Sequence, residues 1–177
     1  MVHGRFQPFH NGHLEYLLAA ARRCERLLVG ITNPDLSRTL PEAADPKRHL
    51  PEANPFTYTE RLLMVEGSVD ENRLDVPVHV IPFPINSPEL WPSYVPAGTV
   101  HLLRVFSDWG ATKLRRLREQ GFEVAVLDEG AAKDVSGEDV RRALRSGGAW
   151  EHLVPPAVAR VIHSLPAQRA RDLGLAL

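Results

Sequence analysis

The feature that most constrains the fold is an alternation of short apolar segments with amphipathic segments of helical spacing. Leu27–Thr32 (LLVGIT) is almost entirely apolar and is followed by Asn33-Pro34, which is typical of a buried strand that ends at a turn. Four other segments are predicted as strands: Met1–Phe6, Val78–Phe83, Val100–Phe106 and Phe122–Leu127. Apolar residues at helical spacing and Ser/Thr capping pairs predict helices near residues 12–26, 57–71, 108–120 and 136–144. Because strands that alternate with helices form parallel sheets, we predict an α/β fold: a doubly wound parallel sheet of about five strands with helices on both faces.

Length and composition indicate one globular domain. The chain has 177 residues, of which we assign 1–165 to the domain and 166–177 to a C-terminal tail or helix. Twenty-one basic and 22 acidic side chains give a formal net charge of −1, which provides no electrostatic basis for binding nucleic acid. The single cysteine, Cys24, excludes an internal disulfide framework. No segment has the apolar length of a membrane span or the pattern of a secretory signal, so we expect a cytoplasmic protein without a membrane partner.

The ligand site is predicted at one edge of the sheet. Ligands of doubly wound sheets bind beyond the carboxyl ends of the strands, near the point where the strand order reverses. The loops after the first four strands and the helix after the fifth are therefore the expected site. Two of these loops, at about 33–56 and 84–97, are long and rich in proline, which is typical of functional loops.

The first candidate site is the segment GRFQPFHNGH, residues 4–13, between the first strand and the first helix. Free N–H groups at a helix N-terminus favour an anion, and the side chains of His10, His13 and Arg5 add directed hydrogen bonds to phosphate oxygens. Gly12 permits close approach of the backbone to a ligand. Taken alone, the two histidines also fit a histidine-rich turn or a two-histidine metal site.

The second candidate site is the helix that begins at Ser136. Its first turn offers N–H donors to a phosphate, and Arg141 can bind phosphate oxygens with both arms of its guanidinium. An ordinary capped helix with solvated arginines is the alternative interpretation of the same residues.

Together these segments resemble the HxGH nucleotidyltransferase superfamily, most closely the archaeal-type nicotinamide mononucleotide (NMN) adenylyltransferases. GRFQPFHNGH matches the superfamily signature, NPFTxxER at 54–61 its second motif, and VSGEDVR at 135–141 its late motif. The segment IPFPIN…W at 81–91 is similar to the substrate loop, and WxxLVP at 150–155 to the C-terminal segment. The resemblance follows the order of the family along nearly the whole chain.

The resemblance implies a Rossmann-like fold and an enzyme that moves a nucleoside monophosphate group from a nucleoside triphosphate to a phosphorylated acceptor, with release of pyrophosphate. It implies Mg²⁺ held mainly through the substrate phosphates. It assigns catalysis to His10, His13 and Arg141, and nucleotide or phosphate binding to Gly4, Arg5, Phe6, Gly12, Arg61, Ser136 and Arg141. Glu138 stands where the family has threonine, so we expect its carboxylate to point away from phosphate or toward Mg²⁺. Arg38, Lys47 and Arg48 are interpreted first as solvated surface cations, and second as cations of a lid over the phosphates.

The acceptor is the least constrained part of the prediction. We predict that it is bound by Ile85, Asn86, Trp91, Asp108 and Trp109, with Trp91 stacked on a heterocycle. The NMN enzymes carry an asparagine three positions before that tryptophan, where this chain has Pro88, and Gly-Asn or Asn-Asn after the fourth strand, where it has Ser107-Asp108. Because most of the matching motifs are those of the NMN enzymes, the first interpretation is adenylyl transfer from ATP to NMN, which forms NAD. The departures at these positions favour the alternative, cytidylyl transfer from CTP to a small phosphate or phosphonate.

Two other classes of protein fit the sequence less well. A non-catalytic nucleotide-binding module would typically lose an imidazole or the late arginine, and this chain keeps all three. A metal-dependent hydrolase would need an acidic ligand beside His10 and His13, and no obvious one is present in the sequence. Assembly into a homo-oligomer is compatible with either nucleotidyltransferase interpretation.

Overall fold

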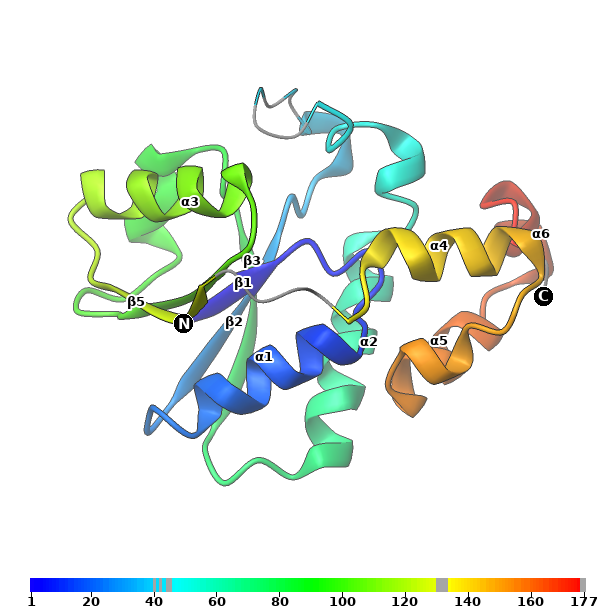
Figure 1. Ribbon diagram of the computed structural model, residues 1–177, viewed down its shortest axis with the longest axis horizontal. Coiled ribbons are helices and arrows are strands. Elements are labelled where there is room, and N and C mark those ends of the chain that lie inside the picture. The colour runs from blue at the N-terminus through cyan, green and yellow to red at the C-terminus, as the bar shows by residue number, and fades with distance from the viewer. Residues whose placement is uncertain (40, 42, 44–45, 130–133, 176–177) are drawn as a thin grey trace.

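The computed structural model describes residues 1–39, 41, 43, 46–129 and 134–175, and the structural statements below concern these residues. Five strands pair in parallel with helices between them (Figure 1), which confirms the predicted α/β class. The strands are divided between two ladders instead of forming one continuous sheet of five. The first ladder holds β1 (Val2–Gly4), β2 (Leu27–Thr32) and β3 (Val78–Phe83), and the second holds β4 (His101–Val105) and β5 (Val124–Glu129).

The two ladders lie side by side at the N-terminus of the chain. The backbone N–H of Leu102 donates to the carbonyl of Met1 at 2.8 Å, and the amino group of Met1 donates to the carbonyl of Val100 at 2.6 Å. The spatial order is therefore β3-β2-β1-β4-β5, with the reversal between β1 and β4. Ladder pairing of β1 covers only three residues, and the chain turns at Phe6, whose φ is 53°. The predicted sheet is thus divided at the strand-order reversal, where doubly wound folds bind their ligands.

Helices cover both faces of the strands (Figure 1). They are α1 (Asn11–Ala21), α2 (Tyr58–Asn72), α3 (Asp108–Glu119), α4 (Gly137–Ser146), α5 (Pro156–His163) and α6 (Ala167–Asp172). Val2 belongs to a core cluster shared with Leu17 of α1 and Met64 of α2, whereas Met1 belongs to a cluster shared with Leu117 of α3. Successive strand residues point to opposite faces, so these two residues lie in the two separate cores.

Most helix ends follow the capping signals in the sequence. Thr57 and Glu60 form a reciprocal capping box at the start of α2, as predicted. The first helix ends at Ala21 and not near residue 26. The predicted tail contains α6, and Arg169 in that helix donates to Glu60 at 2.8 Å, which joins the C-terminal segment to the start of α2. Among the described residues, no helix combines the length and the apolar character that crossing a membrane requires.

Candidate active site

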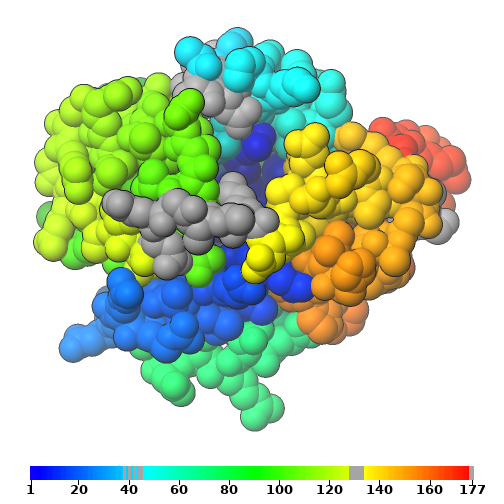
Figure 2. Space-filling view, viewed as in Figure 1, coloured from blue at the N-terminus to red at the C-terminus, as the bar shows by residue number. Residues whose placement is uncertain are grey.

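A pocket of about 380 Å³ lies at the strand-order reversal. Its walls come from the loop after β1, the end of β4, and the first turns of α1, α3 and α4. Figure 2 shows the hollow between the green α3 region, the yellow α4 and the cyan segment, with N-terminal residues in blue at its floor. The pocket therefore occupies the place predicted from the alternation of strands and helices.

The pocket is strongly cationic. Six basic side chains line it against three carboxylates: Arg5, Lys47, Arg48, Arg104, Lys113 and Arg141 against Glu15, Asp134 and Glu138. Three helix N-termini add their free N–H groups and the positive ends of their dipoles. An arrangement of this kind is suited to a ligand with several negative charges.

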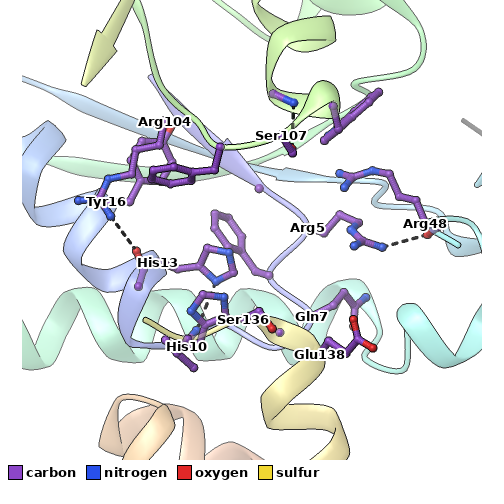
Figure 3. A pocket seen from close by; sticks show the side chains of 18 of the residues that line it. Arg5, Gln7, His10, His13, Tyr16, Arg48, Arg104, Ser107, Ser136 and Glu138 are labelled. Carbon is purple, nitrogen blue, oxygen red and sulfur yellow. Dashed lines mark hydrogen bonds between the residues drawn. The ribbon is translucent and has the colours of Figure 1, made fainter. Parts of the chain in front are cut away.

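His10 and His13 lie together at the first turn of α1. Their rings stack with centroids 3.6 Å apart and planes 27° apart, and both line the pocket (Figure 3). The backbone N–H of His10 donates to Nδ1 of His13 at 3.4 Å, so His10 and His13 together form the N-terminal capping box of α1. Phe6 packs edge-on against the His13 ring at 4.9 Å. The local fold thus fixes both imidazoles toward the pocket, as the sequence motif predicted.

Two glycines leave room for the aromatic rings of this motif. A Cβ added at Gly4 would lie 2.6 Å from the Phe6 ring, and one added at Gly12 would lie 3.3 Å from the His10 ring. Gly4, Phe6 and Gly12 all line the pocket. The rings of Phe6 and His10 therefore depend on neighbouring glycines for their positions.

The start of α4 closes one side of the pocket. The Ser136 side chain accepts from the Asp139 N–H at 3.2 Å and donates to the Asp139 carboxylate at 2.6 Å. The hydrogen bond from the Ser136 side chain is the main cause that lowers the pKa of Asp139, which keeps the cap ionised. Arg141 lines the pocket and donates to the carbonyl of Gln7 at 2.6 Å. A Cβ at Gly137 would lie 2.9 Å from that carbonyl oxygen, so only glycine allows this approach of α4 to the β1–α1 loop.

Gln7 is a positioning residue that sequence reasoning missed. Its side-chain amide donates to the carbonyl of Phe56 at 2.8 Å and accepts from the N–H of Phe56 at 2.8 Å. This buried pair of bonds joins the β1–α1 loop to the segment that precedes α2. No local pattern identifies such a contact, because its partner lies 49 residues away.

The structure gives Arg61 a position different from the predicted one. Its side chain is fully buried and does not line the pocket. Its guanidinium donates to the carbonyls of Arg5 (2.9 Å), Thr32 (2.7 Å) and Asn33 (2.9 Å), and burial lowers its pKa to about 10. The predicted phosphate contact is therefore replaced by a structural one: Arg61 holds the loops that follow β1 and β2 at a fixed distance from each other.

Most of the residues predicted to bind the acceptor also lie outside the pocket. The loop after β3 contains a short 3-10 helix, Pro88–Ser93, that turns Trp91 into the core, where it is fully buried and donates to the Pro84 carbonyl at 2.9 Å. Trp91 has no face open to a heterocycle, so the predicted stacking does not occur in this structure. Ile85 is likewise a buried core residue, and neither Asn86 nor Asp108 lines the pocket. Of the five predicted residues, Trp109 alone lines it.

Several pocket residues were not assigned a site role from the sequence. Arg104, at the end of β4, donates to the carbonyl of Gly12 at 3.4 Å, and Lys113 lines the pocket from α3. Arg48, interpreted first as a surface cation, lines the pocket with Lys47 and lies 4.5 Å over the ring of Trp109. The side chain of Arg38 lies outside what the structure describes. The missed residues share no sequence motif, and only the tertiary fold brings them together.

The family of the chain follows from comparison with known proteins. Residues 1–146 match the family described as cytidylyltransferase-like. The chain belongs to this family. The cytidylyltransferase-like family match contains every pocket residue named above, from the β1–α1 loop to Arg141.

Two relatives of this cytidylyltransferase-like protein represent the two interpretations made from the sequence. A phosphonoformate cytidylyltransferase of Streptomyces viridochromogenes is 50% identical over 163 residues, which are 92% of this chain and 89% of the relative. A nicotinamide-nucleotide adenylyltransferase of Picrophilus torridus is 36% identical over 172 residues, which are 96% of this chain and 94% of the relative. The protein is therefore a nucleotidyltransferase, and its relatives support both the cytidylyl and the adenylyl interpretation.

A solved structure supports the Rossmann-like fold. The bifunctional NMN adenylyltransferase/ADP ribose pyrophosphatase of Francisella tularensis superposes with a TM-score of 0.70 at 17% identity. The alignment covers 98% of this chain but 51% of that longer chain, so this protein spans about half its length. At this identity the likeness concerns the fold alone.

Proposed function

We propose that this protein transfers a cytidylyl group from CTP to a small phosphonate acceptor of the phosphonoformate type and releases pyrophosphate. The observation that carries nucleotidyl transfer is the convergence of His10, His13, Ser136 and Arg141 on one cationic pocket. The choice of cytidylyl transfer is supported by the 50% identity to the phosphonoformate enzyme over most of both chains.

The reaction is an in-line displacement. An oxygen of the acceptor phosphonate attacks the α-phosphorus of CTP and forms a new P–O bond, while the bond from that phosphorus to the oxygen shared with the β-phosphorus breaks. Pyrophosphate leaves with the electron pair of the broken bond. The attacking oxygen is already ionised at neutral pH, so catalysis consists of positioning and of stabilising negative charge.

The residues of the pocket are suited to both tasks. His10 and His13 donate to oxygens of the α- and β-phosphates, where charge develops as pyrophosphate leaves. Arg141 and the first turn of α4, with Ser136, bind the outer phosphates, and Arg5 supports the phosphates from the β1–α1 loop. Arg61 has no contact with substrate in this proposal and acts as a positioning residue through the carbonyls it binds.

A divalent cation fits the charges of the pocket. Mg²⁺ prefers oxygen ligands and keeps several waters, and it is commonly held by substrate phosphates with one or two carboxylates. The carboxylates in the described part of the pocket, all with side chains exposed enough to share it, are Glu15, Asp134 and Glu138. The bound ion would neutralise charge on the triphosphate. A related fold has been solved with AMP and a manganese ion, in the Francisella tularensis bifunctional enzyme.

The geometry of the pocket supports a small acceptor. Trp91, predicted to stack on a heterocycle, is fully buried, and Trp109 has Arg48 over its ring at 4.5 Å and only 6% of its surface exposed. Neither indole offers an open face to a large heterocycle. Pro88 also lacks the carboxamide partner that the NMN enzymes have at that position of the loop.

Adenylyl transfer from ATP to NMN is the second candidate. It is favoured by the 36% identity to the Picrophilus torridus enzyme over 96% of this chain. The two candidates share the phosphate chemistry and differ in the base and the acceptor.

Pyrophosphate release distinguishes the candidates. Purified protein with Mg²⁺ is assayed with ATP, CTP, GTP and UTP, each with phosphonoformate, with NMN and without acceptor. The proposal predicts release that requires both CTP and phosphonoformate. Efficient release that requires ATP and NMN would replace it with the second candidate.

A further inference from the structure

His3 is a buried imidazole that lacks a hydrogen-bond partner. It is the middle residue of β1, and only 2% of its surface is exposed. Neither ring nitrogen has a partner among the described residues. Its ring contacts are aromatic: Phe83 at 5.3 Å and His101 at 5.6 Å between centroids. Burial of two polar atoms without partners is unfavourable, so the pattern indicates a group that a ligand completes.

His3 faces the pocket on the side of α3. It lines the pocket, as do Ser107, Trp109, Gly110 and Lys113, which we call the α3 end of the pocket. Figure 3 shows Ser107 across the pocket from His10 and Ser136, so the α3 end lies opposite the residues proposed to bind the triphosphate. Burial lowers the pKa of His3 well below its usual value, and the nearby charges of Lys113 and Arg48 add to this effect. His3 is thus neutral at pH 7 and has one N–H to donate.

We propose that His3 and Lys113 bind the carboxylate of the acceptor at the α3 end of the pocket, while the phosphonate of the same acceptor faces His10 and His13. This inference rests on the proposed function, because it takes the acceptor to be a small phosphonate with a second acidic group. It adds the residues that recognise that group and makes the carboxylate the feature by which acceptors are selected.

The chemistry of the two side chains suits a carboxylate. A lysine ammonium supplies charge, and a neutral imidazole supplies a directed N–H bond without adding a second buried charge. Hydrogen bonds to charged groups are stronger than neutral ones, and removal of one partner weakens binding by about 10- to 100-fold. An acceptor without the carboxylate, such as methylphosphonate, would accept no hydrogen bond from His3 and form no ion pair with Lys113, so it would gain nothing from them.

Binding to four variants tests the proposal. Affinities for phosphonoformate and methylphosphonate are measured by calorimetry on protein saturated with Mg²⁺ and α,β-methylene CTP, which cannot transfer its cytidylyl group. The test variants are His3→Phe, which keeps a buried ring, and Lys113→Met, which keeps most of the stem. The matched controls are His101→Phe, a second buried imidazole without partners that does not line the pocket, and Arg115→Met, an exposed cation of the same helix.

We expect each test variant to weaken phosphonoformate binding about 10-fold or more, with methylphosphonate and the CTP analogue changed less than about twofold. The two controls should leave all three affinities unchanged. Equal losses for both phosphonates, equal losses in His3→Phe and His101→Phe, or wild-type protein that does not prefer phosphonoformate would each overturn the proposal.

Turnover of the wild-type protein separates this inference from the proposed function. If the expected affinities are found but CTP and phosphonoformate release no pyrophosphate, the proposed function fails and the carboxylate site stands. If pyrophosphate is released but the affinity ratio is the same in all variants, the proposed function stands and the carboxylate site fails.

Discussion

The imidazole rings of His10 and His13 stack 3.6 Å apart at the first turn of α1, so that the N-cap and the third residue of one helix face the same pocket. The stacking contact helps to fix the orientation of each ring. It also places two sets of ring nitrogens beside the N–H groups of the helix start, where an anion is favoured. The arrangement is suited to hold two neighbouring phosphate groups during transfer.

Substitution His13→Ala should lower kcat far more than it raises KM for CTP. In the proposed mechanism the contact of His13 with phosphate strengthens as charge develops at the α-phosphate, and loss of one such donor typically costs about 10²–10³ in rate. Steady-state kinetics of pyrophosphate release measure both constants. His79→Ala, an exposed histidine on β3, is the control and should leave both unchanged. A higher KM with an intact kcat would show that His13 only binds the ground state.

Substitution Arg141→Lys should also impair turnover, by about 10²-fold, because a point charge replaces a fork that donates to Gln7 and, in the proposed mechanism, also to phosphate. Arg142→Lys is the matched control, since Arg142 is exposed and pairs with Asp139 on the outside of the same helix. The same assay measures both variants. Near-normal activity of Arg141→Lys would place Arg141 outside the catalytic machinery.

The sequence was informative where local physics decides the structure. The strand Val78–Phe83 and the capping boxes at Thr57 and Ser136 depend on neighbouring residues, and each was predicted correctly. Arg61 and Trp91 were assigned to substrate because an arginine in a motif and a tryptophan in a loop do not reveal their burial. Arg61 instead donates to the distant carbonyl of Thr32, and Trp91 to the nearby carbonyl of Pro84. Only the tertiary structure determines that both side chains are buried.

The pocket residues that were not assigned a site role from the sequence were missed for the same reason. Gln7, Arg104 and Lys113 come from three separate segments and share no spacing that chemistry would require. Their roles arise because the reversal of strand order brings the loop after β1 beside β4 and α3. The division of the strands into two ladders was also not predictable, since the pairing between β1 and β4 joins segments about 100 residues apart.

Substitution Arg61→Lys should destabilise the fold by about 2–3 kcal/mol, because one lysine cannot reach the carbonyls of Arg5, Thr32 and Asn33 together. Urea unfolding followed by circular dichroism measures the free energy of unfolding. Arg115→Lys, on an exposed face of α3, should change it by less than about 0.5 kcal/mol. A stable Arg61→Lys protein with a raised KM for CTP would support the phosphate contact predicted from the sequence instead.

His101 should make the fold sensitive to acid. Burial lowers the pKa of His101 from 6.5 to about 4 in the folded protein. His101 is therefore protonated below about pH 6.5 in the unfolded chain, but only below about pH 4 in the folded protein. The stability it contributes is therefore complete above pH 6.5 and is lost as the pH falls toward 4, by roughly 3 kcal/mol in total. Urea unfolding at pH 7 and pH 4 should show a smaller loss in His101→Phe than in wild type. An equal loss in both proteins would contradict this assignment.

The most direct test of the account is to follow the phosphorus atoms of one reaction. Wild-type protein, Mg²⁺, CTP and phosphonoformate are observed together by ³¹P nuclear magnetic resonance. We expect the phosphonate signal to move to that of a cytidylyl-phosphonate anhydride, coupled to a new α-phosphorus signal, with pyrophosphate formed in equal amount. Consumption of CTP to free CMP or CDP with the phosphonate signal unchanged would contradict it.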